Sequence, residues 1–121
     1  MVGIVKVDTL QNNAGTSSVG MDYVVNGSAK AWVSFDTDAV INESFNGSSI
    51  VDNSTGQFKY NINSALNSSN FAELTSVGVS KHFSGWFGIR STTVCGILTF
   101  NNSHGYQDYN DMNISINGDL A

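Results

Sequence analysis

Apolar side chains recur at every second position along much of this chain, and short runs of turn-forming residues separate the segments in which they do so. Gln57–Asn63 alternates strictly between polar and apolar residues. In Ala29–Phe35, Val33 and Phe35 share one face with the alanines, whereas Trp32 lies on the opposite face. Side chains of a β-strand point alternately to the two faces of its sheet, so a period of two predicts strands with one buried face.

Turn-forming residues lie between the predicted strands. The Asn-Gly dipeptides at 26–27 and 46–47 are typical of tight hairpins, because both residues tolerate positive φ. Asn53–Gly56 is a further turn, and Gly88 and Gly96 are positions at which a strand can bend or bulge. The predicted strands are Ile4–Asp8, Met21–Val25, Ala29–Phe35, Val40–Phe45, Ser49–Asp52, Gln57–Asn63, Val77–Phe83, Trp86–Phe100 and Met112–Ile116, and the predicted loops are Gln11–Ser18, Ser64–Leu74 (with at most one helical turn) and Asn101–Asn110.

Length and composition support an all-β fold. The chain has 121 residues, which suits one domain, and it is rich in Asn, Ser, Thr and Gly, which favour turns and do poorly inside helices. Short strands with turns between them predict an antiparallel β-sandwich, jelly-roll-like, with short strands and long polar loops. We expect residues 1–20 to form an N-terminal strand and polar loop, and residues 21–121 to form the sandwich domain.

The charge distribution argues against nucleic acid as a partner. The net charge is −5 and the five Lys and Arg residues are scattered, whereas phosphate recognition needs a cluster of cations. Met1–Asp8 lacks the charged and long apolar parts of a signal peptide, and no window is apolar for long enough to span a membrane. We therefore expect synthesis in the cytoplasm of the producing cell and no membrane insertion. Cys95 is the only cysteine, and its apolar neighbours favour a buried, unreactive thiol.

The sequence contains no recognisable catalytic or metal-binding motif. Glu43, Glu73, Asp108 and Asp111 lie in no motif of a paired-carboxylate hydrolase, and Gly-x-Ser-x-Gly is absent. The two histidines and the single cysteine are too far apart in sequence to indicate a metal site. We expect a protein that is not an enzyme and that holds no metal and no cofactor.

One region combines aromatic side chains with amides and carboxylates. It consists of His82–Phe87 and Asn101–Tyr109. Aromatic rings stack on the apolar face of a pyranose, and amides or carboxylates hydrogen-bond to its hydroxyls, so this composition suits a sugar-binding loop. The alternative is that the aromatic rings fill the core or a subunit interface. The candidate glycan-binding residues are Tyr106, Tyr109, Asp108, Asn102 and Trp86.

Several phrases of the sequence resemble a known family. Gly3–Asn12, Ser28–Phe35, Ser44–Phe58 and Asn113–Asp119 are similar to segments of the C-terminal, receptor-binding tip domain of phage tail fibres, of the kind common in marine phages. The phrase Ala29–Val33 is the most specific of these. The match covers about the first half of the chain and, more loosely, its last strand.

The resemblance implies a homotrimer on a virus particle, in contact with other virion proteins and with a host-surface polysaccharide. Residues 1–20 would then supply the attachment or trimer contact, in which Ile4, Val5 and Val7 are buried. We therefore expect a non-enzymatic virion protein that is made in the host cytoplasm and serves host attachment.

Other functions stay open at this point. A capsid decoration or cement protein that stabilises the phage head is the first alternative, since a small acidic chain suits that role. A free-standing glycan-binding domain without any particle is the next, and a glycan hydrolase is the last. These alternatives differ in which surface of the protein is used.

Overall fold

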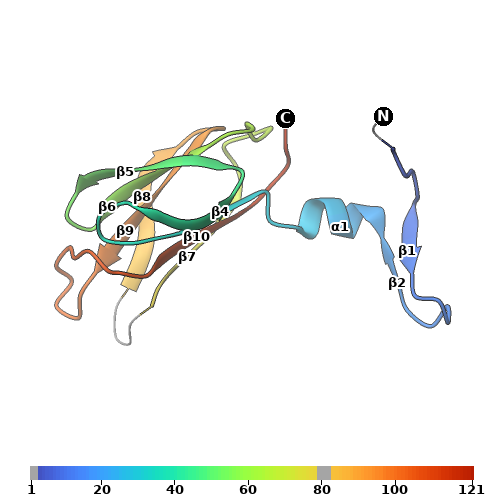
Figure 1. Cartoon of the computed structure of the whole chain (residues 1–121), viewed down its shortest axis with the longest axis horizontal. Coiled ribbons are helices and arrows are strands. Elements are labelled where there is room, and N and C mark those ends of the chain that lie inside the picture. Colours follow the sequence, from blue (N-terminus) through green and yellow to red (C-terminus); the bar gives the residue numbers. More distant parts are fainter. Residues whose placement is uncertain (1–2, 79–82) are drawn as a thin grey trace.

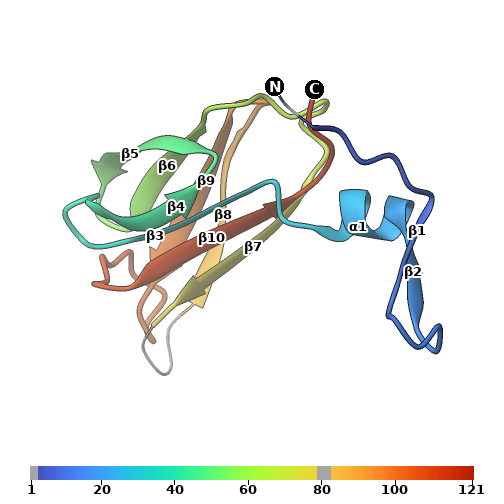
Figure 2. The ribbon, with the colours of Figure 1, turned by 45° about the vertical axis from the view of Figure 1, so that its right-hand side comes forward.

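The computed structural model describes residues 3–78 and 83–121 of the chain. Within these ranges the chain forms ten β-strands and one α-helix, and strands β3 to β10 form two four-stranded antiparallel sheets packed face to face (Figures 1 and 2). The predicted all-β antiparallel sandwich is therefore confirmed. Its strands are β3 (Ala31–Phe35), β4 (Ile41–Phe45), β5 (Gly47–Ser54), β6 (Gln57–Ile62), β7 (Ala72–Val77), β8 (Phe83–Arg90), β9 (Val94–Phe100) and β10 (Met112–Asn117).

Both sheets combine strands from distant parts of the chain. The order is β4-β3-β10-β7 in the first sheet and β5-β6-β9-β8 in the second. The hairpins β3–β4, β5–β6 and β8–β9 each stay within one sheet, whereas the other connections cross from one sheet to the other. The last strand, β10, lies between β3 and β7, with Met112 opposite Phe35 and Ile116 opposite Ala31. This pairing of the first and last strands of the sandwich closes the fold.

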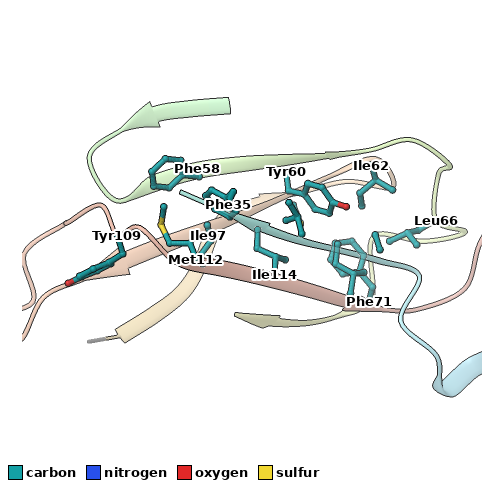
Figure 3. Close-up of a cluster of buried hydrophobic side chains, with 14 residues drawn as sticks. Phe35, Phe58, Tyr60, Ile62, Leu66, Phe71, Ile97, Tyr109, Met112 and Ile114 are labelled. Carbon is teal, nitrogen blue, oxygen red and sulfur yellow. The ribbon is translucent and has the colours of Figure 1, made fainter. Parts of the chain in front are cut away.

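The core lies between the two sheets and contains the apolar residues of the alternating pattern (Figure 3). The Phe35 ring on β3 meets the Phe58 ring on β6 edge-on, with 5.3 Å between the ring centroids. Burial of apolar area is the main stabilising term in folding, so these inward faces hold the sheets together. The buried apolar residues are Ala31, Val33, Phe35, Phe58, Tyr60, Ile62, Leu66, Phe71, Cys95, Ile97, Tyr109, Met112, Ile114 and Ile116.

The predicted glycine positions lie at a turn and at a β-bulge. Gly56 has a φ of 67° and ends the turn between β5 and β6, so the predicted turn at Asn53–Gly56 is confirmed. Gly88 has a φ of 75° and lies within a register shift of the β8–β9 pair, as expected for a β-bulge. Gly96 pairs regularly with Lys59 on β6, and on its other side it lies between Ile97 and Cys95, opposite the bulge of β8.

Neither Asn-Gly dipeptide forms the predicted hairpin. Asn46 and Gly47 connect β4 in one sheet to β5 in the other. Asn46 has a φ of 56°, its Nδ2 donates to the Lys30 carbonyl at 2.9 Å, and its Oδ1 accepts from the Ser64 N–H at 2.8 Å. These side-chain bonds to two other segments stabilise a corner between the sheets rather than a two-residue turn within one sheet. Positions 26–27 lie at the end of a helix.

The predicted strand at Ile4–Asp8 is wrong. The first strand is β1 (Thr9–Gln11), and it pairs with β2 (Ser18–Gly20) in a hairpin that is separate from the sandwich. The predicted polar loop at Gln11–Ser18 forms the turn of this hairpin. Asn12 closes the turn, because its Oδ1 accepts backbone hydrogen bonds from positions 16 and 17 at 2.9 and 3.1 Å. An alternating pattern predicts that a segment can be a strand, but it does not identify the partner strand.

The predicted strand at Met21–Val25 is also wrong, because these residues belong to helix α1 (Met21–Gly27). A helix satisfies its backbone hydrogen bonds locally, which an unpaired strand cannot do. Residues 3–27, comprising the extended start, the β1–β2 hairpin and α1, form an arm beside the sandwich (Figures 1 and 2). The first strand of the sandwich begins at Ala31.

Two side chains of the sandwich hold the C-terminal end of α1. The Lys30 ammonium donates to the Ser28 carbonyl and hydroxyl, both at 2.9 Å, and also to the Val25 carbonyl. Asn117 on β10 donates from Nδ2 to the Gly27 carbonyl at 3.1 Å. The last carbonyls of a helix lack partners within the helix and carry partial negative charge, so a cation and an amide donor stabilise this junction.

The connection between β6 and β7 is a loop, as predicted for Ser64–Leu74, although its last residues belong to β7. Leu66 and Phe71 in this loop are buried, so the loop covers one end of the core. The predicted strand at Val77–Phe83 overlaps the end of β7 and the start of β8, and its residues 79–82 lie outside the described residues.

Candidate functional site

The predicted sugar-binding loop lies between β9 and β10 and is held by its own hydrogen bonds. Asn101 Oδ1 accepts from the N–H groups of Ser103 and Gly105, at 2.9 and 3.0 Å. His104 has a φ of 61°, in the left-handed region that a tight turn of this kind needs. Asn102 is exposed next to this turn. The loop therefore presents Asn102 on an ordered tip.

Tyr106 follows the turn and is half exposed. Its ring stacks on the Phe100 ring, with 5.1 Å between centroids and 29° between the ring planes. One face of the Tyr106 ring is therefore covered by Phe100, and 50% of the residue stays accessible. A single free aromatic face is what stacking on a pyranose requires.

Asp108 and Tyr109 have structural roles in the same loop. Asp108 Oδ1 accepts from the Gly56 N–H at 2.5 Å and so fixes the β5–β6 turn. Tyr109 is 6% exposed, its ring belongs to the core, and its hydroxyl donates to the Phe100 carbonyl at 3.1 Å (Figure 3). Tyr109 is therefore a core residue, and its ring is not available for stacking on a sugar.

Trp86 lies on β8, and its side chain is outside the described residues, as is His82. Of the five candidate site residues, Asn102 and Tyr106 thus present described, exposed side chains. An open groove of about 590 Å³ beside the loop is lined by Asp108 and Asp111 among others. Both carboxylates already accept hydrogen bonds, Asp108 from Gly56 and Asp111 from Asn113 Nδ2 at 2.9 Å. These bonds explain the acidic lining without a ligand.

A second exposed surface lies on the outer face of the sheet β4-β3-β10-β7. The strand register places Phe45 opposite Trp32, Trp32 opposite Ser115, and Ser115 opposite Leu74. These four residues form a row across all four strands of the sheet, which we call the outer row. Phe45 and Leu74 are exposed, and Trp32 is 36% exposed. Three large apolar side chains in one cross-strand row on the solvent face are not required by the fold.

The neighbouring residues of the same face are polar. The next outward-facing position of each strand, two residues along, is polar. At these positions Ser34 lies opposite both Glu43 and Asn113, and Asn113 lies opposite Ser76. A groove of about 350 Å³ runs over β10 between these residues and the outer row. Its lining residues are Trp32, Val33, Leu74, Thr75, Ser76, Asn113, Ile114 and Ser115, none of which is charged.

Tyr60 supports the outer row from inside the sandwich. It lies on β6 in the opposite sheet, its side chain is fully buried, and its hydroxyl lies 3.0 Å from the carbonyl oxygens of both Trp32 and Phe45 (Figure 3). Burial, with a smaller contribution from Cys95, raises the pKa of Tyr60 to about 12, so the hydroxyl keeps its proton for donation. A Cβ on Gly47 would collide with this hydroxyl.

The sequence pattern already placed Trp32 on the face opposite Val33, and this is confirmed. It did not reveal the outer row, because Phe45 and Leu74 come next to Trp32 only through strand register. A search for large apolar residues out of phase with the buried positions would have found Trp32, which alternates with the buried residues of β3.

Two ionisable side chains between the sheets, those of Glu73 and Cys95, have raised pKa values. Glu73 on β7 has a side chain only 3% exposed, and its Oε2 lies 3.5 Å from Arg90 Nη2 on β8. Burial raises the pKa of Glu73, and Arg90 partly opposes that shift. Burial, and then the charge of Glu73, raises the pKa of the Cys95 thiol, so this cysteine is not activated as a nucleophile.

Among residues 3–78 and 83–121, no group of three or more His, Cys, Asp or Glu residues is close enough to hold a metal ion. The single described helix is too short to cross a membrane. No protein-family model, no curated protein and no solved structure matches this chain.

Proposed function

We propose that this chain is a non-enzymatic structural protein of a phage virion, a tail-fibre-like domain that recognises a host-surface glycan and assembles as a homotrimer. The observation that carries the proposal is the division of the chain into an exposed arm and a compact sandwich. In the arm, residues 3–27, no residue is buried. The sandwich has a complete core of its own.

The arm suits an assembly role because it is not stable by its own contacts. Its hairpin pairs strands of three residues each, and its helix has seven residues. Isolated hairpins are marginal in water, as are isolated helices shorter than about 12 residues. The arm nevertheless exposes several apolar side chains, with Ile4 at 77% and Val5 at 84%. Packing of three arms against one another would bury these residues, in line with the trimer that the resemblance implies.

The sandwich suits a recognition role because it is bound to the arm at one end only. The β9–β10 loop, with Asn102 and Tyr106, lies at the end of the sandwich away from the arm (Figures 1 and 2). A subunit attached through its arm would therefore present this loop and the outer row to its surroundings. Three copies on one particle gain avidity from their high effective concentration, even where each contact is weak.

Immunogold electron microscopy of the particles that carry this chain tests the proposal. Antibody raised against the purified chain is expected to place gold at the tail, and the purified chain is expected to compete with these particles for adsorption to host cells. Gold spread over the head, with adsorption unchanged, would instead favour a capsid decoration protein in which the arm docks onto capsomers. Absence of the chain from purified particles would leave a free glycan-binding domain.

A further inference from the structure

The candidate residues of the β9–β10 loop offer little surface for a sugar. Asp108 and Tyr109 are used within the protein, by the Gly56 N–H and by the core. Tyr106 keeps one ring face free for a sugar, and Asn102 is the other candidate of this loop with an exposed side chain. The outer face of the sheet β4-β3-β10-β7 offers a larger surface. Its outer row has three large apolar side chains, and two of them, Trp32 and Leu74, line a groove that also has polar lining residues.

We infer that the groove over β10 on this face is the glycan-binding site, and that a neutral pyranose stacks on Trp32 there. The inference rests on the proposed function and names the site at which that function is carried out. Trp32 and Leu74 flank the groove, and Ser115 lies between them in the register. The apolar side chains of Trp32 and Leu74 thus lie on either side of the polar Ser115. Apolar side chains can contact the two apolar faces of a sugar ring, and a polar group between them can bond to its equatorial hydroxyls.

The polar groups of the groove have hydrogen-bonding capacity to spare. In the part of the chain that the structure describes, the hydroxyls of the lining residues Ser76 and Ser115 make no hydrogen bond. Asn113 donates from Nδ2 to Asp111 Oδ1 at 2.9 Å, which orients the amide and leaves its carbonyl oxygen as an acceptor. A hydroxyl both donates and accepts, so serines and an amide oxygen suit the hydroxyls of a sugar better than they suit an ion.

Charge favours a neutral ligand. None of the lining residues is charged, and the ionisable side chains beside them are acidic: Asp111 is bonded to Asn113, and Glu43 lies opposite Ser34. The chain as a whole carries a net charge of −5. An acidic sugar would bring a carboxylate to a site without a cation, at a cost in desolvation and repulsion. A neutral hexose chain meets no such penalty.

The extent of the apolar surface argues against a protein partner on this face. A stable protein interface buries about 800 Å² on each side and has a dry apolar centre. Here the apolar side chains form one row, and the next register step is polar at Ser34, Asn113 and Ser76. One row of rings with polar flanks fits one or two sugar units.

The stacking residue is positioned before any ligand arrives. The Tyr60 hydroxyl holds the backbone carbonyls of Trp32 and Phe45 at 3.0 Å, and Trp32 lies on β3, which is paired on both sides. A site with an ordered backbone loses less conformational entropy on binding. Tyr60 is accordingly a positioning residue, and Trp32 is the residue that contacts the sugar.

The test uses the full chain and a printed panel of neutral hexose oligosaccharides and uronic-acid oligosaccharides, with titration calorimetry on the sugars that bind. We expect binding to neutral members and little to acidic ones. Trp32→Ala should weaken that binding about tenfold or more, and Trp32→Tyr should restore part of it, because a ring is replaced by a ring. Val51→Ala, on the exposed face of the other sheet, is the matched control and should bind like the wild type.

The other outcomes overturn the inference in distinguishable ways. If Trp32→Ala binds normally and Tyr106→Ala does not, the site is the loop, and glycan recognition still stands. If the wild type binds no sugar on the panel but immunogold labelling places the chain at the tail, the groove is not a glycan site. The receptor is then not a glycan of this kind. If Trp32→Ala changes the sedimentation coefficient but not the binding, the outer row is a contact between copies of the chain. Circular dichroism of each variant checks that the sandwich is folded.

Discussion

Glu73 is a carboxylate between two sheets, and its protonation should affect stability. Burial raises its pKa above the ordinary value of 4.5, and Arg90 opposes the shift in part. The folded state then holds a proton at pH values where the unfolded chain has lost it. Stability therefore falls as the pH rises from about 4.5 through the raised pKa of the folded state.

Glu73→Gln removes this titration while keeping the shape of the side chain. As the pH rises from 4.5 through that window, the wild type should lose stability relative to the variant. The difference in free energy of unfolding, variant minus wild type, should therefore increase. Urea unfolding at a series of pH values measures this difference, and effects of other acidic residues cancel in it. A difference that is constant with pH would mean that Arg90 fully offsets the effect of burial, so that the pKa of Glu73 is the same in the folded and unfolded states.

Tyr60→Phe tests the hydroxyl that supports the outer row. The Tyr60 hydroxyl has one proton, which it donates to the Trp32 or the Phe45 carbonyl, so its loss removes one buried hydrogen bond and should reduce the free energy of unfolding by about 1–2 kcal/mol. Tyr106→Phe is the control, because that hydroxyl is on an exposed residue, and it should leave stability unchanged. Chemical denaturation of both variants gives the comparison. Equal stability of Tyr60→Phe and the wild type would mean that water replaces the hydroxyl.

At the scale of elements, the crossing from β4 to β5 depends on Gly47. A Cβ at this position would collide with the Tyr60 side chain, which is fully buried and cannot move aside. We expect Gly47→Ala to destabilise the protein by about 1–3 kcal/mol, as overpacking does in other cores. Gly27→Ala, where a Cβ meets nothing within 4 Å, is the matched control and should be neutral or slightly stabilising. Thermal unfolding of the two variants distinguishes them.

The strands that could be predicted are those whose pattern is set by the core. β6 and β10 alternate strictly because every second residue is buried, and the sequence shows this without knowledge of the partner. Ile4–Asp8 and Met21–Val25 show a similar pattern outside the sandwich, where no core selects between strand, helix and extended chain. The Asn46–Gly47 corner was missed because its stability comes from side-chain bonds to Lys30 and Ser64, which are distant in sequence.

The candidate site was predicted less well than the fold, for related reasons. Polar neighbours indicated that Tyr109 lies on a loop and left open whether its ring binds a sugar or fills the core; in the structure Asp108 bonds to the β5–β6 turn and the Tyr109 ring is in the core. The outer row joins residues of β3, β4, β7 and β10, and it exists only in the register of those strands. A surface that combines four segments has no signature in any one of them.

At the scale of the whole molecule, the protein has a sandwich with a buried core and an arm in which no described residue is buried. The sandwich buries its core between two sheets, whereas the arm is held mainly at the end of α1, by Lys30 and Asn117. Apolar residues that are exposed in an isolated subunit are expected to become buried on assembly. If the proposed function is right, contact among copies of the chain should bury these side chains and give an assembly with three binding sites.

Charged substitutions in the arm test this assembly. The wild type is expected to sediment at three times the chain mass of 12.9 kDa, and the double variant Ile4→Asp, Val5→Asp at that chain mass, because a trimer contact cannot bury six unpaired carboxylates. Val40→Asp, at an exposed apolar position of the sandwich, should remain trimeric. A wild type that is monomeric at all concentrations would exclude a self-assembled trimer. The arm would then be a docking segment for another virion protein, and the valence would come from the particle.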